Sequence, residues 1–325
     1  MIDIPSLFKT TAEYGVLLKD KKKGVLSHAY LTVTPDGRFL DEYLKFIAKV
    51  IVCDEEEPCL TCRKCRLIDQ NAYPDVKFFP KDDSVKTDDV TEIIEESYVM
   101  PVEDDKKVFV ISHAETMNEI AQNKLLKTLE EPPENVYIVL GATVEFPLLS
   151  TLKSRVKKFR IPAFSDRALF SALKGDCPDE ERLKTAIAAG DGTAGKALSL
   201  YNDDELAEIT ATVTDVIVNM KKSSDVLAFS NKVADLSRDL NEFLSVMLLA
   251  FREMLCACEG RKDLIRSEKL FKGIENAEGF TRGAIMHAID KTGEALLRKK
   301  YNGNDQMITE WLFFQILEGK YKWQK

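Results

Sequence analysis

Four cysteines lie within thirteen residues of the chain, with the spacing C-x5-C-x2-C-x2-C: Cys53, Cys59, Cys62 and Cys65. Two overlapping C-x2-C steps bring thiolates close enough to share one tetrahedral ion, and the upstream cysteine completes a four-sulfur shell. This pattern predicts a structural zinc site, because a filled shell leaves no position for water or substrate. The alternative is a set of reduced or disulfide-paired cysteines, which an intracellular chain disfavours.

Length and charge narrow the class of protein. A chain of 325 residues is longer than the roughly 250–300 residues at which single cores stop growing, so we expect more than one domain. The formal net charge of -8 disfavours a generally basic nucleic-acid binder. No basic segment followed by an apolar stretch opens the chain, and the longest apolar run, about 243–251, is too short to span a bilayer. We therefore expect a cytoplasmic protein with no membrane partner.

The first half of the chain alternates strand-like and helix-like patterns. Short apolar runs of the strand type occur at residues 28–33, 75–79, 107–111 and 136–140. Apolar residues at helical spacing occur at 39–52, after Thr87 and at 120–129. The alternation, with nearly continuous apolar strands, predicts an α/β fold around a parallel sheet.

Beyond about residue 164 the strand patterns end and helical periodicity dominates. Two or three short helices are expected over 164–200, and longer ones around 231–258, 282–299 and 305–319. The change of pattern predicts three domains. An α/β domain covers 1–162 and carries the cysteine module at about 53–65; a small helical domain follows over 163–204, and a helical oligomerisation domain over 205–325.

The segment after the first predicted strand has the position of a phosphate-binding loop but lacks its residues. Such a loop needs glycines, a Lys for the phosphates and a Ser or Thr for Mg²⁺. Residues 34–42 contain a single glycine, no Lys followed by Ser or Thr, and carboxylates at Asp41 and Glu42. Ser112 follows the strand at 107–111, where an acid should hold the metal. The chain is therefore expected not to hydrolyse ATP; the alternative is that no nucleotide fold exists here.

Several motifs together resemble those of bacterial clamp-loader subunits, a branch of the AAA+ family. The stretch Asn-Lys-Leu-Leu-Lys-Thr-Leu-Glu-Glu-Pro-Pro at 123–133 resembles their LLKTLEEPP signature, and residues 28–31 resemble the strand that enters their phosphate loop. The four cysteines resemble their zinc module, and residues 152–155 resemble their Ser-Arg-Cys motif, with Val156 in place of the cysteine. The resemblance is densest over 25–162. It implies an AAA+-type sheet domain with an inserted zinc module, a small helical lid domain and a C-terminal all-α collar domain.

The resemblance also implies a function for individual residues. Arg155, with Ser154 positioning its loop, would be an arginine finger that reaches ATP on a neighbouring subunit. The chain would bind structural Zn²⁺ and no ATP of its own. Thr143 and Lys196 fall where active relatives contact ATP, and here we expect a loop hydrogen-bonder and a surface lysine. The implied partners are the motor and delta subunits of a hetero-pentameric ring, the sliding clamp, and primed DNA through the complex.

Three functions remain open from the sequence. The leading one is a non-catalytic subunit of the DNA polymerase III clamp loader, which supports ATP-dependent loading of the sliding clamp on primed DNA. The second is an ATP-hydrolysing motor subunit of the same complex, against which the phosphate-loop defects argue. The third is a stand-alone zinc-knuckle nucleic-acid binder, against which the negative charge argues. Nucleotide binding separates the first two, and DNA binding by the isolated chain tests the third.

Overall fold

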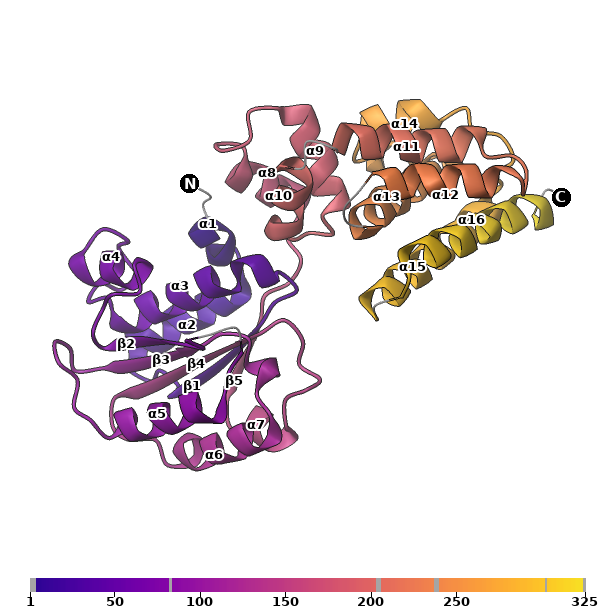
Figure 1. The fold of residues 1–325 in the computed structure, drawn as a ribbon. Coiled ribbons are helices and arrows are strands. Elements are labelled where there is room, and N and C mark those ends of the chain that lie inside the picture. The colour runs from indigo at the N-terminus through magenta and orange to yellow at the C-terminus, as the bar shows by residue number, and fades with distance from the viewer. Residues whose placement is uncertain (1–3, 82–83, 203–205, 237–239, 302, 324–325) are drawn as a thin grey trace. The chain divides into compact units, whose positions relative to one another are not determined.

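Five parallel strands form a single sheet in the first half of the chain, in the order β2-β3-β4-β1-β5 (Figure 1). The computed structural model describes residues 4–81, 84–202, 206–236, 240–301 and 303–323. The strands are β1 (Ala29–Val33), β2 (Val76–Phe79), β3 (Lys107–Ile111), β4 (Val136–Ala142) and β5 (Lys157–Arg160). Four of them confirm the strands expected from the sequence. The fifth has the sequence Lys-Lys-Phe-Arg and lies at the sheet edge, where charged residues protect an exposed strand from pairing with other chains.

Helices cover both faces of this sheet (Figure 1). On one face lie α1 (Ile4–Lys9), α2 (Ala12–Lys23) and α3 (Leu40–Val52), with α4 (Arg63–Asp69) beside them. The other face carries α5 (Thr87–Ser97), α6 (Glu119–Glu130) and α7 (Ser150–Lys153). Because strand side chains alternate, Leu31, Phe109 and Leu140 join one core with residues of α5 and α6, while their neighbours face α3.

Helix α3 packs unusually closely on strand β4. A Cβ atom at Gly141 would lie 2.5 Å from Cδ1 of Leu44 and 2.9 Å from Cδ1 of Leu40, so only glycine allows this approach. The first turn of α3 is thereby fixed against the carboxyl edge of β4. This contact places residues 34–42, the candidate phosphate loop, directly at the end of the sheet.

The second compact unit of the chain, residues 169–325, consists of helices. Helix α8 (Asp166–Leu173) spans the division, and α9 (Glu180–Ala189) and α10 (Ala194–Asn202) follow, which confirms the short helices expected over 164–200. The remaining helices are α11 (Leu206–Asn219), α12 (Asp225–Asp235), α13 (Leu240–Cys258), α14 (Glu268–Ile274), α15 (Arg282–Lys300) and α16 (Asp305–Lys322). The helix expected around 231–258 is therefore wrong as a single element. Its residues belong to α12 and α13, and 237–239 lie outside the described residues.

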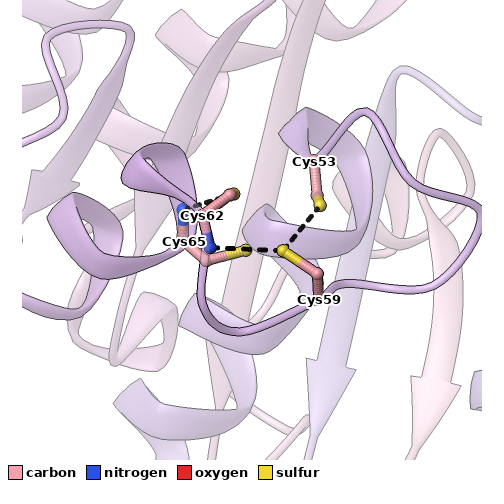
Figure 2. Close-up of side chains that lie close together, drawn as sticks. All are labelled: Cys53, Cys59, Cys62 and Cys65. Carbon is pink, nitrogen blue, oxygen red and sulfur yellow. Dashed lines mark hydrogen bonds between the residues drawn. The ribbon is translucent and has the colours of Figure 1, made fainter.

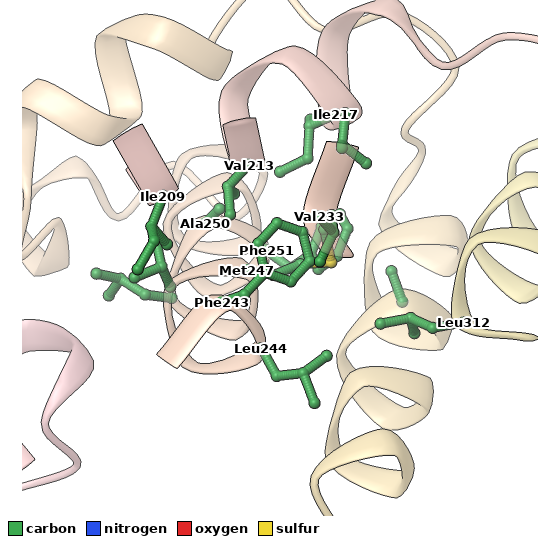
Figure 3. Packing of buried hydrophobic residues seen from close by; sticks show 14 of the residues in the cluster. Ile209, Val213, Ile217, Val233, Phe243, Leu244, Met247, Ala250, Phe251 and Leu312 are labelled. Carbon is green, nitrogen blue, oxygen red and sulfur yellow. The ribbon is translucent and has the colours of Figure 1, made fainter. Parts of the chain in front are cut away.

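Helix α13 forms the centre of this second unit (Figure 3). Phe243, Met247 and Phe251 are buried among residues of α11, α12 and α16. A helix that is apolar on most of its surface needs partners all round, and here several helices supply them. Residues of α9 and α10 join the same core. The predicted boundary at 204/205 lies outside the described residues and stays a prediction.

No helix in the described part of the chain is long and apolar enough to cross a membrane.

Two buried charged residues hold the loop between α5 and β3. The Asp75 carboxylate, fully buried, accepts hydrogen bonds from the backbone N–H groups of Val102, Glu103 and Asp104 at 2.6, 2.8 and 2.9 Å. The Lys107 ammonium, 3% exposed, donates to the carbonyl oxygens of Glu96 and Val99. Backbone N–H groups satisfy Asp75, and backbone carbonyls together with the Glu96 carboxylate, at 2.9 Å, satisfy Lys107, so the loop is fixed although its own side chains are largely exposed.

We expect Asp75→Ala to lower the free energy of unfolding by about 3 kcal/mol or more, because it leaves three backbone N–H groups without an acceptor. Asp75→Asn keeps one acceptor oxygen and should lose less. Asp105→Ala, at an exposed position of the same loop, is the control and should stay within about 0.5 kcal/mol of wild type. Urea unfolding measures the three values, and equal stability of Asp75→Ala and Asp105→Ala would contradict the assignment.

Candidate functional site

The four cysteines come together at the junction of α3 and α4 (Figure 2). Cys53 is the C-cap of α3, Cys59 lies in the connecting loop, and Cys62 and Cys65 begin α4. The Sγ atom of Cys62 caps α4 by accepting the backbone N–H of Cys65 at 3.4 Å, and Sγ of Cys59 accepts the N–H of Cys62 at 3.3 Å. Leu60 adopts a left-handed backbone with φ of 61°, which turns the chain between Cys59 and Cys62.

The sulfur geometry fits a four-thiolate metal centre. All four Sγ atoms lie within 4.8 Å of one another, and those of Cys53 and Cys59 are 3.8 Å apart. A tetrahedral zinc site with Zn–S bonds of about 2.3 Å has sulfur–sulfur edges of roughly 3.8 Å. A disulfide requires about 2.05 Å, and the described cysteines are all free thiols. Zinc is the metal that this donor set suits best, and with four protein ligands it would be structural.

The surroundings favour thiolate at part of this cluster. Backbone N–H groups of Thr61 and Cys62 lower the pKa of Cys59 to about 6, whereas burial raises the pKa of Cys65. Two of the four cysteines, Cys53 and Cys65, are buried, and a bound cation would supply the counter-charge that thiolates in such a cluster need. The ammonium group of Lys21 lies near, donating to the backbone carbonyls of Cys53 and Glu55.

The cysteine module is tied to the rest of its domain by charged pairs. On one side, α2 holds the acidic run after Cys53, because Lys22 pairs with Glu56 at 2.7 Å and the Tyr14 hydroxyl donates to Glu57. On the other side, Arg63 pairs with Glu103, and Lys64 pairs with Asp104 at 2.8 Å. Asp75 fixes the backbone of both acids. The module is therefore a braced part of the sheet domain.

Residues 34–42, where the sequence places a degenerate phosphate loop, lack the left-handed backbone that a phosphate-binding loop requires. Phosphate-binding nests alternate right- and left-handed residues so that successive N–H groups converge. Over the described residues 34–42 no backbone has positive φ, and Gly37 lies in a short 3-10 helix (Gly37–Phe39). A Cβ atom at Gly37 would meet Cγ2 of Thr143 at 3.2 Å, so the segment lies directly over the end of β4.

A hydrogen bond joins the end of β3 to the first turn of α3, the two places where the sequence leads us to expect a metal-holding acid and a phosphate loop. The Ser112 hydroxyl, just beyond β3, donates to the carboxylate of Asp41 in the first turn of α3. Burial raises the pKa of the neighbouring Glu42, and the carboxylates of Asp41 and Asp36 add to the shift. This edge of the sheet therefore concentrates acidic oxygens, which repel a triphosphate.

Thr143, at this edge, and Lys196, in the second unit, are also bonded within the chain. The Thr143 hydroxyl donates to Oε1 of Glu115 at 2.7 Å, and its backbone N–H donates to the same oxygen at 3.1 Å. Thr143 therefore forms hydrogen bonds as a loop residue, as expected from the sequence. Lys196, in the second unit, pairs with Asp191 at 3.0 Å and is about one-third exposed, in keeping with the expected surface lysine.

Arg155 follows Ser154, the C-cap of α7, and is partly exposed. Its Nη1 donates to the carbonyl oxygen of Thr151 at 2.8 Å and to Oγ of Ser154 at 3.4 Å, and its Nη2 donates to the carboxylate of Glu130. The basic residues that follow are paired with acids, Lys157 with Asp20, and both Lys158 and Arg160 with Glu145.

Comparison with known proteins finds similarity to subunits of DNA polymerase III. The family described as "DNA polymerase III, delta subunit" matches residues 10–165. DNA polymerase III subunit delta' of Bacillus subtilis is 28% identical over 317 residues, which cover 94% of each chain. The delta' subunit of Haemophilus influenzae is 29% identical over 195 residues, covering 58% of this chain and 60% of that protein.

The chain is similar to DNA polymerase III delta-prime subunits over nearly its whole length. The tau subunit of Bacillus subtilis is also similar, at 24% identity over 87% of this chain, but the match spans only 56% of tau. A solved gamma subunit-related protein of Thermotoga maritima is 20% identical, with a TM-score of 0.44 over 94% of this chain and 99% of its own. The nearly full-length match to delta-prime agrees with the expectation from the sequence.

Sequence reasoning missed two side-chain contacts in this chain. Asp41 and Ser112 were noted separately as defects, yet their contact joins residues 71 positions apart. Glu130 was noted only as part of the LLKTLEEPP signature, and its pairing with Arg155 was not expected. An available signal was the position of Glu130 at the C-terminus of a helix, where acids oppose the helix dipole.

We expect the purified protein to contain one tightly bound zinc ion per chain. Cys62→Ser should release it, because a three-sulfur site loses geometry and charge balance, and should expose the loop at 54–58 to limited proteolysis. Cys258→Ser removes an exposed thiol outside the cluster and should leave the metal content unchanged. Elemental analysis decides the matter, and folded, reduced protein prepared without chelator that lacks stoichiometric zinc would refute the assignment.

Proposed function

We propose that this chain is the non-catalytic delta-prime-type subunit of a bacterial clamp loader, and that it supports ATP-dependent loading of the sliding clamp on primed DNA. The hydrogen bond between Ser112 and Asp41 carries the proposal, taken together with the family match. It joins the two positions that an active ATPase reserves for phosphate and metal. A chain in which Ser112 and Asp41 are bonded to each other would contribute to the clamp loader without hydrolysing ATP of its own.

The contribution we assign is an arginine finger in trans. Arg155 lies on a short loop next to the sheet, with its guanidinium partly accessible to a neighbouring chain. A guanidinium is always charged and planar, and it stabilises the charge that develops as phosphate is transferred. Ser154 contacts the same guanidinium at 3.4 Å and helps to shape the loop. Arg155 and the neighbouring basic residues all have acidic partners within the chain, so the assignment of the finger to Arg155 rests on the resemblance of residues 152–155 to the Ser-Arg motif.

The second unit of the chain supports a role in assembly. We assign residues 163–204 to a lid domain and 205–325 to a collar domain that contributes to a hetero-pentameric ring with the motor and delta subunits. The shared core around α13 supplies a rigid helical body for such contacts. The zinc module is structural in this account and supplies no chemistry. As a replication subunit, the protein acts in the cytoplasm, where the bacterial chromosome lies.

A second function, an ATP-hydrolysing motor subunit of the tau or gamma type, has support from the similarity to tau. The two functions differ in what they require at the end of the sheet where β3 meets α3: a motor subunit needs an open nucleotide site there, and a non-catalytic subunit does not. A motor needs converging N–H groups and a metal-binding acid, whereas residues 34–42 have no positive φ and Ser112 is bonded to Asp41. A zinc-knuckle nucleic-acid binder is disfavoured because the module has the acidic run of residues 54–57 on its surface.

Arg155→Ala should lower the DNA- and clamp-stimulated ATPase of the reconstituted complex and slow clamp loading. The site it completes should lose the large rate factor of an arginine finger, about 10³–10⁵ in related enzymes, while other sites continue to turn over. Folding and assembly should be unaffected, since the side chain is a surface group. Arg160→Ala is the control, because it removes an exposed arginine from the adjacent strand. Wild-type loading rates for Arg155→Ala, or equal defects in both variants, would remove Arg155 from the mechanism.

A further inference from the structure

The guanidinium of Arg155 is bound by three acceptors from two elements. Glu130, the last residue of α6, accepts a hydrogen bond from Nη2, while Thr151 in α7 and Ser154, the C-cap of α7, accept from Nη1 at 2.8 and 3.4 Å. Both terminal nitrogens of Arg155 therefore have acceptors, and together these hydrogen bonds fix the plane of the guanidinium. Arginine has five N–H donors, and three acceptors leave the remaining donors to contact a ligand.

Glu130 stands at a position that helix physics disfavours. The carbonyl end of a helix carries partial negative charge, so acids there are destabilising and bases are usual. Helix α6 nevertheless ends in Glu130 and is capped by Glu131 before two prolines. The Glu130 side chain is 49% exposed and that of Arg155 is 32% exposed, and such surface pairs contribute little to folding. A fold-stabilising role therefore does not explain the pair.

Pre-orientation of the arginine does explain it. A free arginine side chain has many rotamers, and fixing one of them on binding costs conformational entropy. A side chain that is already held in the binding rotamer avoids this loss of rate or affinity. Two acceptors on α7 alone leave the guanidinium free to swing, because both bind the same nitrogen, Nη1. Glu130 adds the contact on Nη2 from a separate element and so defines the direction in which the remaining donors point.

We propose that Glu130 is a positioning residue for Arg155, which holds the guanidinium oriented for a phosphate on a neighbouring subunit. The inference rests on the proposed function of Arg155 as an arginine finger. Glu130 itself touches no nucleotide in this account. It acts through Arg155, so its effect exists only while Arg155 is present.

The test compares variants in the complex reconstituted with the motor and delta subunits, with ATP as the probe. Glu130→Ala should lower kcat of the stimulated ATPase two- to tenfold at the affected site, the range expected for ordering one long side chain, and leave KM for ATP unchanged. Glu130→Gln keeps an acceptor oxygen and should restore most of the rate. Glu131→Ala removes the adjacent exposed acid and should behave as wild type. In the Arg155→Ala background, Glu130→Ala should have no further effect.

The outcomes separate this inference from the function on which it rests. If Arg155→Ala itself leaves the ATPase and clamp loading at wild-type rates, the proposed function fails. If Arg155→Ala slows the complex but Glu130→Ala matches Glu131→Ala, Arg155 keeps its role and Glu130 loses its own. A further loss from Glu130→Ala in the Arg155→Ala background also refutes positioning. Thermal unfolding of the isolated variants completes the test, because equal stabilities exclude a purely structural cause of any rate difference.

Discussion

The proposed function of this chain depends on the hydrogen bond from Ser112 to Asp41, which ties the end of β3 to the first turn of α3. It connects the ends of β3 and α3, which the approach of α3 to Gly141 has already brought to one edge of the sheet. With Asp36, Glu42 and Glu115 nearby, that edge has the charge of a metal site but no converging N–H groups for phosphate. In the proposed function, the sheet serves as a scaffold, and Arg155 is the residue that would act on ATP bound to a neighbouring subunit.

Two other parts of the sheet domain are braced by a similar use of charge. Asp75 and Lys107 are buried, and each is satisfied mainly by backbone groups of one loop, which in turn presents Glu103 and Asp104 to Arg63 and Lys64 of the cysteine module. We therefore expect metal binding by the cysteines to be coupled to the order of this loop, with a structural role for the metal. Arg155 is held in the same manner by Glu130 and α7. Rigid placement of a few charged groups fits a subunit that completes a neighbour's site.

Much of this arrangement could be predicted from residue spacing, and what escaped prediction has a physical reason. The cysteine spacing indicated the metal centre, and four strands followed from apolar runs. Strand β5 escaped because an edge strand of Lys, Lys, Phe and Arg has no apolar pattern. The pairs Ser112–Asp41 and Arg155–Glu130 join residues 71 and 25 positions apart, and their contact depends on sheet order and helix packing, which spacing does not encode. Likewise, the single helix expected near 231–258 is two, since apolar periodicity continues across both.

The central claim is that the nucleotide position of this chain is closed, and ATP binding by the isolated protein tests it most directly. Isothermal titration calorimetry with ATP and Mg²⁺ should give no saturable heat in the micromolar range, under conditions where a purified motor subunit, as positive control, binds. The physical reasons are the Ser112–Asp41 bond, the carboxylates around it and the absence of a phosphate nest in residues 34–42. Saturable, Mg²⁺-dependent binding of ATP at one site per chain would contradict the account and restore the motor interpretation.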